Sequence, residues 1–336
     1  MDLSLTAEQQ QLVDGFAGAL SRGASSEQVR AAEPLGFDKA LWDQLQGMGI
    51  VEMAVPEEAG GWGATTLDLA LVAEQVGRFV APVPAIETQV AARLLARLGA
   101  SAPLQAALDA TRIVTLALHP AVDGRAGLVP AGAVADDVVV RRGEDLLLVP
   151  AEGARQGVEV LGSMPVADVT VDDAAEVLAS GPEAVAAFEA AVDDHLVLTA
   201  AALVGMGAKA VELGVDYVKE RKAWGKPIGS FQSVAHRLAD AHTAIEGARL
   251  ITYEAAWAQA EEPARARELA CFAFGYAAES AREATYRALH YHGGYGFMNE
   301  YDPQLYWRRA RAWAGLFGEP RAAYARGERA RLERTA

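Results

Sequence analysis

The sequence predicts a mainly α-helical protein with a small β region between two helical regions. Three observations support this fold class. Apolar residues recur at helical spacing in the first third of the chain, short β-branched runs follow, and a long helical repeat occupies the rest. The 336 residues are enough for more than one domain. We therefore expect an N-terminal helical domain (1–110), a reduced middle β domain (111–180) and a C-terminal helical bundle (181–336).

The N-terminal region carries signals for helix starts and stops. Thr6 is followed three residues later by a glutamine, which is the pattern of a capping box at the start of a helix. A later helix is predicted over 66–78, because Gly77 and the prolines beyond it end the helical pattern. Between these two helices, apolar residues at helical spacing indicate another one: Phe37, Leu41, Leu45 and Met48.

The middle region has the residue pattern of short strands. Turn residues (glycine, proline and aspartate) separate β-branched runs, as in a small antiparallel sheet or barrel. The predicted strands are 113–116, 138–140, 146–149, 158–161 and 169–171.

The C-terminal region has the strongest helical pattern. Apolar residues step by three and four from Val185 to Tyr217, and Gly225 then interrupts the pattern. A second helix follows. A third starts near Pro263, a favoured first helical position, and ends at a glycine pair. A fourth begins at Asp302, a capping residue followed by proline. Long helices joined by short breaks predict an up-and-down bundle, typically of four helices.

Composition excludes several classes of function. A formal charge of −15 argues against nucleic acid or an anionic membrane surface as the main partner. The lone Cys271 excludes an internal disulfide framework, and the six histidines lack metal-ligand spacing, so no metal site is expected. The start has no basic region typical of a signal peptide, and the longest uncharged apolar stretch, 196–208, is too short to span a bilayer. We expect a soluble, cytoplasmic protein.

Two loops that interrupt the bundle carry the informative chemistry. Residues 221–232 read RKAWGKPIGSFQ, which places a guanidinium and an aromatic ring at a helix end and an amide at the next helix start. Helix N-termini and guanidinium groups bind phosphate well. Residues 290–297 read HYHGGYGF and expose backbone amides at a glycine turn. Each segment could also be only a connection between helices.

Three segments together resemble the acyl-CoA dehydrogenase family. They are AVPEEAGGWG at 54–63, the segment from Arg221 to Asp240, and HGGYGFMNEY at 292–301. Their order and spacing match the family, and the resemblance covers essentially the whole chain. It implies the acyl-CoA dehydrogenase-like fold, with a helical domain, a middle β domain and a four-helix bundle.

The resemblance also implies an activity: FAD-dependent α,β-dehydrogenation of an acyl-CoA thioester. In that reaction a carboxylate takes the α-proton, a hydride passes to the flavin, and an acceptor such as an electron-transfer flavoprotein takes the electrons. In the family, the two loops reach across a subunit interface to a neighbour's FAD. Carried over, the cofactor-binding residues are Arg221, Trp224, Gln232, His290, Gly293 and Gly294.

This chain departs from the family pattern where the catalytic base is expected. The usual late glutamate position falls at Phe317, with Glu319 two residues away. Relatives with the base on the first bundle helix would place it near His195, next to Asp194, or near Ala202. Asp194, His195 and Glu319 are therefore only candidates, and the acids near the start of a long helix could simply favour its dipole.

The middle domain departs as well. It is short and lacks the family's Thr-Glu-Pro-x-x-Gly-Ser-Asp flavin-lining segment; the residues 119–124 stand roughly in its place. Shortened chains of this kind resemble subunits of heteromeric acyl-CoA dehydrogenases, in which two unlike subunits build each flavin site.

Three hypotheses follow. The first is a base-lacking partner subunit in an α2β2 enzyme, acting with a homologous subunit on a bulky thioester such as a steroid or polyketide-like one. The second is a self-sufficient dehydrogenase or related flavoenzyme that uses Asp194, His195 or Glu319 as its base. The third is a flavin-free helical scaffold.

Overall fold

The computed structural model describes residues 4–151 and 155–335, and it confirms the predicted fold class, mostly helical with a small β region. Its helices and strands are α1 (Ala7–Gly23), α2 (Ser26–Ala31), α3 (Lys39–Gln46), α4 (Thr66–Arg78), α5 (Ala85–Arg97), α6 (Ser101–Leu108), β1 (Val114–Leu116), β2 (Arg125–Val129), β3 (Asp137–Arg142), β4 (Asp145–Pro150), β5 (Ala167–Thr170), β6 (Glu176–Ser180), α7 (Pro182–Glu220), β7 (Lys222–Ala223), β8 (Lys226–Pro227), α8 (Gln232–Glu261), α9 (Pro263–His292), α10 (Pro303–Gly315) and α11 (Pro320–Thr335). Short 3-10 helices lie at Glu52–Ala54, Glu57–Ala59, Ile228–Ser230 and Gly293–Phe297.

The chain forms two compact units, which are described separately. The first, here called the bundle unit, contains Met1–Ser26, Ala70–Ala81 and Val197–Ala336. The second, here called the sheet unit, contains Glu27–Leu69 and Pro82–Leu196. Helices α4 and α7 each contribute residues to both units.

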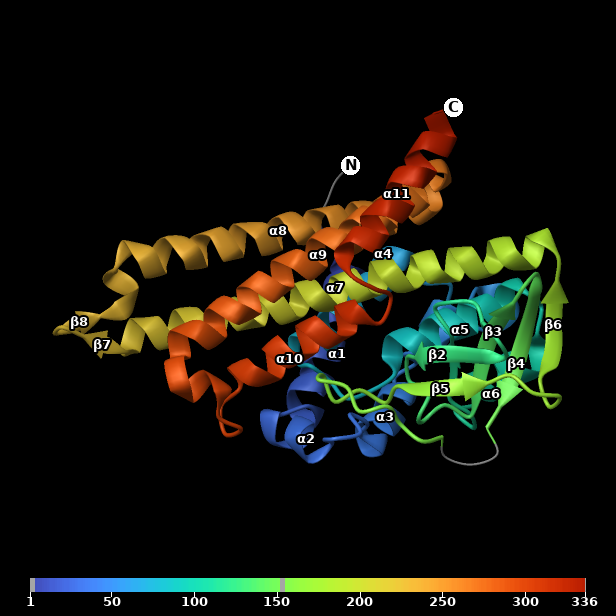
Figure 1. Cartoon of the computed structure of the whole chain (residues 1–336), viewed down its shortest axis with the longest axis horizontal. Coiled ribbons are helices and arrows are strands. Elements are labelled where there is room, and N and C mark those ends of the chain that lie inside the picture. The colour runs from blue at the N-terminus through green and yellow to red at the C-terminus, as the bar shows by residue number, and fades with distance from the viewer. Residues whose placement is uncertain (1–3, 152–154, 336) are drawn as a thin grey trace. The chain divides into compact units, whose positions relative to one another are not determined.

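Small residues allow the helices of the bundle unit to approach closely. A Cβ added at Gly207 of α7 would lie 2.2 Å from Ile245 of α8, and one at Gly214 would lie 3.4 Å from Ala288 of α9. Figure 1 shows α8 and α9 beside the second half of α7, with the β7–β8 hairpin joining α7 to α8 at one end. The predicted bundle therefore forms, with α11 as an additional helix packed on α9.

The contact between α4 and α7 depends on glycine in the same way. A Cβ at Gly77 would lie 1.8 Å from the carbonyl oxygen of Ala202, and one at Gly205 would lie 1.9 Å from the carbonyl oxygen of Glu74. No larger residue fits either position without moving a backbone. Ala202, where steroid-type relatives would carry a base, is fully buried in this helix pair.

The sheet unit holds a four-stranded sheet with the order β1-β3-β4-β6 and a separate β2–β5 pair. Strands β3, β4 and β6 pair antiparallel, and β5 pairs antiparallel with β2. The core between them consists of buried aliphatic side chains that alternate along β3 and β4: Val138, Val140, Leu147 and Val149. This alternation explains why the β-branched runs of the middle region form strands.

Several local predictions need correction. Strand β1 pairs parallel with β3, so the sheet is mixed, and the described strands close no barrel. The predicted strand at 158–161 does not form; one isolated bridge at Gly157 stands beside it. Strands β2 and β6 were not predicted, because three of the five residues in each are exposed and the apolar alternation is broken. The capping box at Thr6 is confirmed, whereas Asp302 makes no side-chain cap.

Helix α7 is long and apolar enough to cross a membrane by length and composition. However, 78% of its most apolar window is buried within the protein. It therefore reads as a central core helix, in agreement with the interpretation of 196–208 from the sequence.

Candidate functional site

The β7–β8 hairpin projects a tryptophan from the end of the bundle. Lys222 pairs with Pro227 and Ala223 with Lys226, which leaves Trp224 and Gly225 as a two-residue turn. Both turn residues have positive φ, +50° and +78°, as a type I′ hairpin requires. Tryptophan is rare in that backbone region. This residue is 89% exposed, and its ring lies edge-on to the Phe231 ring with 5.7 Å between the ring centres.

The hairpin and its flanks are strongly basic in an acidic chain. Residues 219–237 contain five Lys and Arg against one glutamate, whereas the whole chain carries −15. Lys226 lies 4.6 Å from the centre of the Phe231 ring. The exposed Arg221 guanidinium makes no ion pair or hydrogen bond with any residue the structure describes. Free cations on an acidic protein indicate an anionic ligand.

Helix α8 begins directly after this loop. Its first residue, Gln232, is exposed, and the preceding Phe231 provides no side-chain cap. The N–H groups of the first turn of this 30-residue helix therefore lack a side-chain acceptor, which is the arrangement that binds phosphate.

The glycine turn after α9 is open to its surroundings. Gly293 has φ +60° and ψ −138°, a conformation that needs glycine. Gly294 has no such need, and a Cβ at either position would meet nothing within 4 Å. Packing within the chain therefore gives no reason for Gly294. A ligand or partner that approaches the backbone closely would give one.

The two histidines at the end of α9 have different roles. His290 is exposed and stacks on Tyr286 at 5.8 Å. His292 is buried, its Nδ1 lies 2.7 Å from the carbonyl oxygen of Ala288, and its ring stacks on Tyr217 at 4.1 Å. The Tyr217 stack fixes the end of α7 to the end of α9.

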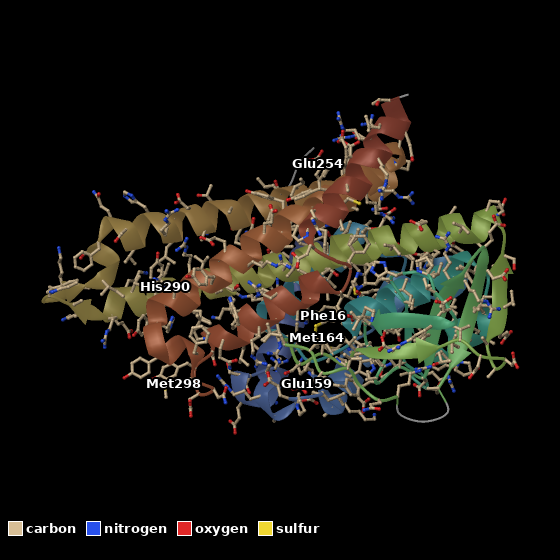
Figure 2. All side chains as sticks on the ribbon, in the orientation of Figure 1. Phe16, Glu159, Met164, Glu254, His290 and Met298 are labelled. Carbon is tan, nitrogen blue, oxygen red and sulfur yellow. The ribbon has the colours of Figure 1, made fainter. Side chains whose placement is uncertain are left out.

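The structure thus brings both predicted loops to one end of the bundle unit. Figure 2 shows His290 near the end of α9, with Met298 in the loop beyond it. The cofactor residues predicted from the sequence all lie at this end: Arg221, Trp224, Gln232, His290, Gly293 and Gly294.

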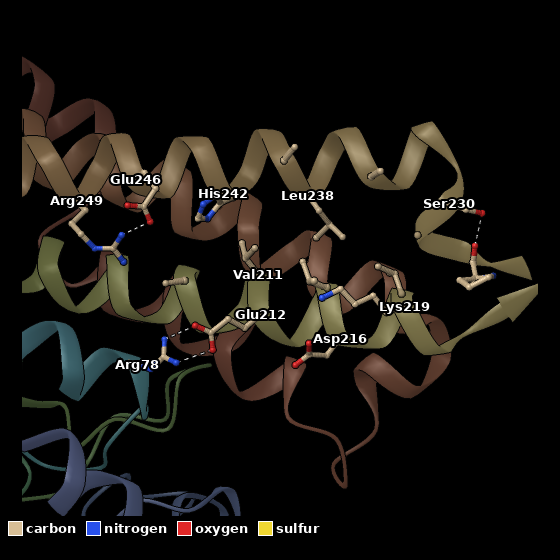
Figure 3. Close-up of a pocket in the computed structure, with 17 residues that line it drawn as sticks. Arg78, Val211, Glu212, Asp216, Lys219, Ser230, Leu238, His242, Glu246 and Arg249 are labelled. Atoms are coloured by element: carbon tan, nitrogen blue, oxygen red, sulfur yellow. Dashed lines mark hydrogen bonds and ion pairs between the residues drawn. The ribbon is translucent and has the colours of Figure 1, made fainter. Parts of the chain in front are cut away.

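A groove of about 1040 Å³ runs between α7 and α8, beside the hairpin (Figure 3). At its inner end, Arg78 donates to both carboxylate oxygens of Glu212, at 2.7 and 2.8 Å, and Arg249 bonds Glu246 and Glu74. The hairpin base lines the other end, where Ser230 donates to the carbonyl of Pro227. Between these two ends, the groove is lined by apolar side chains: Ala208, Val211, Val215, Val218, Ala235, Leu238 and Ala239.

Asp194, a candidate base, forms ion pairs with two arginines of α5. It is 2% exposed, and its Oδ2 accepts from Arg97 at 2.8 Å. Its Oδ1 lies 3.7 Å from Arg93, whose guanidinium also donates to the carbonyls of Ala54 and Ala64 and to the hydroxyl of Thr66. Two guanidinium groups stabilise the ionised carboxylate. The arrangement joins α7 to α5 and to the loop before α4.

The neighbouring His195 is buried, and burial lowers its pKa to about 4. Its ring is therefore neutral near pH 7 and weakly basic. Asp193 is also buried. The three adjacent residues are buried, and Asp193 lies eleven residues after Pro182, the first residue of α7. The alternative interpretation, that these acids favour the dipole at a helix start, is therefore wrong, because the dipole acts within the first turn.

Glu319 and Phe317 lie just after α10. Glu319 is exposed and paired with Arg282 at 2.8 Å, and this hydrogen bond lowers the pKa of its carboxyl group. Phe317, at the position predicted from the sequence for the family's late glutamate, packs edge-on against the buried Phe274 with 5.7 Å between ring centres. Glu319 is thus paired with its own cation within the bundle unit, as Asp194 is within the sheet unit.

Glu87 was not marked by any motif. It is the third residue of α5. The only feature of the sequence that distinguishes it is that it is an acidic residue in the first turn of a helix whose other residues are mostly apolar. Burial raises its pKa to about 7.

No cluster of three His, Cys, Asp or Glu able to hold a metal occurs in the ranges that the structure describes.

The corner formed by the two loops fits a dinucleotide. The pyrophosphate group needs cations, free N–H groups and close backbone approach, and this corner offers Arg221, the start of α8 and the open glycines. Trp224 offers an exposed aromatic face beside them.

Comparison with known proteins identifies the family. Residues 6–110 match the acyl-CoA dehydrogenase N-terminal domain, and residues 187–319 match the C-terminal domain. Acyl-CoA dehydrogenase IpdE2 of Mycolicibacterium smegmatis is 30% identical over 94% of this chain and 96% of its own length. Two solved structures also align. They are the Tcur3481-Tcur3483 steroid ACAD G363A variant (28% identity, 97% and 98% coverage) and the ChsE4-ChsE5 complex from Mycobacterium tuberculosis (27%, 99% and 99%), both with a TM-score of 0.88.

These relatives match over nearly the whole chain, including both functional loops. Acyl-CoA dehydrogenases are FAD-dependent oxidoreductases, and the corner described above suits that cofactor. On this evidence, the chain belongs to the acyl-CoA dehydrogenase family.

Proposed function

We propose that this chain is the base-lacking subunit of a heteromeric, α2β2 acyl-CoA dehydrogenase that acts on a bulky, steroid-like acyl-CoA thioester. A homologous partner would hold most of the FAD, and this chain would complete the site. The observation that carries the proposal is that the Arg221 guanidinium has no partner among the described residues and lies at the same end of the bundle unit as glycines that no described residue approaches. The names of the relatives, a steroid acyl-CoA dehydrogenase and a ChsE4-ChsE5 complex, support it.

Each residue of the corner has a distinct task. The planar Arg221 fork suits bidentate contact with the pyrophosphate, and the first turn of α8 adds N–H donors and the Gln232 amide. Trp224 gives the adenine ring a surface to stack on. Gly293 and Gly294 let the backbone approach the cofactor. When bound, FAD supplies the acceptor for the substrate hydride.

The candidate bases support the partner-subunit role. Asp194 is held by two arginines, Glu319 by one, and His195 is neutral because of its burial. Asp194 is almost fully buried, the pKa of Glu319 is lowered by its arginine, and burial lowers the pKa of His195 to about 4, so none of the three is suited to act as the general base. In this proposal the partner provides the base, and an external acceptor such as an electron-transfer flavoprotein takes the electrons.

Two surfaces of the bundle unit suit a partner chain. One is the apolar α7–α8 groove, which the hairpin base closes at one end. The other is the loop after α9, where four large apolar or aromatic residues are 40–63% exposed: Tyr295, Phe297, Met298 and Tyr301. Exposed aromatic and methionine side chains are typical of protein interfaces.

The test is co-expression with a homologous subunit encoded nearby. We expect this chain alone to be colourless and the co-purified complex to show flavin absorbance. Arg221→Gln should lower FAD retention about 10- to 100-fold, because a hydrogen bond to a charged group contributes about 1.5–3 kcal/mol. Arg329→Gln, at another exposed arginine, is the matched control and should retain FAD normally.

Other outcomes would contradict the proposal. A yellow, active assembly of this chain alone would indicate the self-sufficient enzyme, and replacing Asp194, His195 and Glu319 in turn would then identify its base. Unchanged FAD retention in the Arg221→Gln complex would favour the flavin-free scaffold.

A further inference from the structure

Helix α3 (Figure 1) carries two buried polar side chains on one face. Trp42 and Gln46 are four residues apart, so they lie on adjacent turns of the same face. Trp42 is 1% exposed and Gln46 is 8% exposed. The indole Nε1 of Trp42 and the amide Nε2 of Gln46 are hydrogen-bond donors, and neither has a partner among the residues that the structure describes. One helix face therefore holds two donors in need of an acceptor.

Two comparable side chains of the sheet unit find their acceptors within the chain. The amide Nε2 of Gln89 donates to the carbonyl oxygen of Ile50 at 2.8 Å, and the hydroxyl of Thr115 donates to the carbonyl oxygen of Pro130 at 2.8 Å. Burying a donor without an acceptor destabilises the folded state, so proteins rarely leave two such groups together. Bulk water cannot serve the two donors of α3, because both atoms are buried. Their acceptor must come from the space beside the helix.

That space is a cavity of about 280 Å³ within the sheet unit. Trp42 and Gln46 both line it, whereas Thr88, whose buried hydroxyl also lacks a partner in the described ranges, does not. The volume is far above the ~30 Å³ that one water occupies and close to the lower limit of ligand pockets, about 300 Å³. The remaining wall includes apolar side chains: Phe37, Ile113 and Val134. The cavity therefore has the size and the mixed lining of a small-molecule site.

The charged residues of the cavity wall are already balanced. Lys39 is paired with Asp43 at 2.7 Å, and Arg112 donates to Asp137 at 2.8 Å. The carboxylate of Asp136 accepts from a backbone N–H at 2.7 Å. Among these described wall residues, no cation is left over to neutralise an anionic ligand, and burying an anion without a cation is costly. A neutral ligand with an acceptor oxygen satisfies both the charges and the donors.

We propose that this cavity binds a small neutral molecule through a carbonyl oxygen, which accepts hydrogen bonds from the Trp42 indole and the Gln46 amide. One carbonyl oxygen has two lone pairs and can therefore accept from both donors. Asp136 can accept from an N–H or O–H group of the same molecule, which favours amides, lactams and hydroxy ketones. All lining residues belong to the sheet unit and none to the corner formed by the two loops. The inference therefore does not rest on the proposed function.

The test is a titration of the full chain with δ-valerolactam, a cyclic amide, followed by the indole N–H signal of Trp42 in heteronuclear NMR. Trp42→Phe assigns that signal. We expect a saturable shift with a dissociation constant in the millimolar range, as suits so small a ligand. Gln46→Leu should weaken binding about 2- to 10-fold, because one hydrogen bond is lost. Gln44→Leu, at an exposed glutamine of the same helix, is the matched control and should bind as the wild type does.

Several outcomes would overturn the inference. They are the absence of a saturable shift up to the solubility limit of the lactam, and a crystal soaked in the lactam whose cavity holds water only. Equal or tighter binding of the anion cyclohexanecarboxylate would contradict the neutral ligand class. A shift that Gln46→Leu leaves unchanged would place the lactam elsewhere. If Gln46→Leu does not fold, Trp42→Phe decides by calorimetry, and an unchanged affinity contradicts the inference.

Discussion

The exposed corner of the bundle unit and the buried cluster of the sheet unit use arginine in opposite ways. Arg221 is exposed and has no partner among the residues described, beside a turn whose glycines touch nothing. Arg93 and Arg97 converge on the buried Asp194, and Arg93 also bonds the loop before α4. The paired charges hold the fold together, whereas the unpaired one has no structural task. Together with the open glycines, the missing partner makes Arg221 the candidate position for a ligand.

The largest effect that tests this contrast comes from Asp194→Ala. It leaves the largely buried Arg93 and the partly exposed Arg97 without their acid, so we expect a loss of about 3 kcal/mol in the free energy of unfolding, measured in urea. Asp43→Ala removes an exposed pair with Lys39 and should cost less than about 0.5 kcal/mol. If Asp194→Ala were as stable as the wild type but inactive in a working complex, the catalytic assignment would return.

A smaller effect of opposite sign is expected for Glu87→Gln. The folded pKa of about 7 lies above the ordinary value of 4.5, so the folded state holds a proton that the unfolded state releases. Wild-type stability should therefore fall as the pH rises from about 4.5 to 7, by about 1–3 kcal/mol in total. Glu87→Gln removes this loss and should be more stable than the wild type at pH 8 but not at pH 4. Parallel unfolding curves at both pH values would contradict this expectation.

The smallest effect on stability is expected for Gly294→Ala. A Cβ there meets nothing, so the free energy of unfolding should change by less than about 0.5 kcal/mol, while FAD retention in the complex should fall. Gly205→Ala provides the contrast, because its Cβ would lie 1.9 Å from a backbone oxygen, and it should cost about 1–3 kcal/mol or more. Thermal unfolding and flavin absorbance together separate the two. Normal FAD retention in Gly294→Ala would mean that the open turn has no close ligand.

The sequence predicted features that depend on neighbouring residues. The capping box at Thr6, the helix over 66–78 and the start of α9 at Pro263 appear as expected, since local chemistry decides them. The parallel pairing of β1 with β3 was not predicted, because strand direction depends on the path of the chain between the strands. The strand expected at 158–161 does not form although three of its four residues are apolar; an isolated bridge at Gly157 lies next to it.

In the candidate site, too, the features set by neighbouring residues were predicted and those set by distant residues were not. The loops at 221–232 and 290–297 were identified from sequence because turn residues and terminal charges reveal loops locally. The state of Asp194 could not be read from sequence, because its partner Arg97 lies 97 residues away. Glu87 escaped notice for the same reason: its distinguishing property is the absence of a partner, which only a folded structure can reveal.

The Trp224–Gly225 turn has a consequence for how the complex assembles. Because both residues already have the backbone angles of a closed hairpin, this segment has little freedom left to lose when it meets another chain. The association rate at this corner should then be limited by diffusion and by the orientation of the two chains, and not by the ordering of a loop.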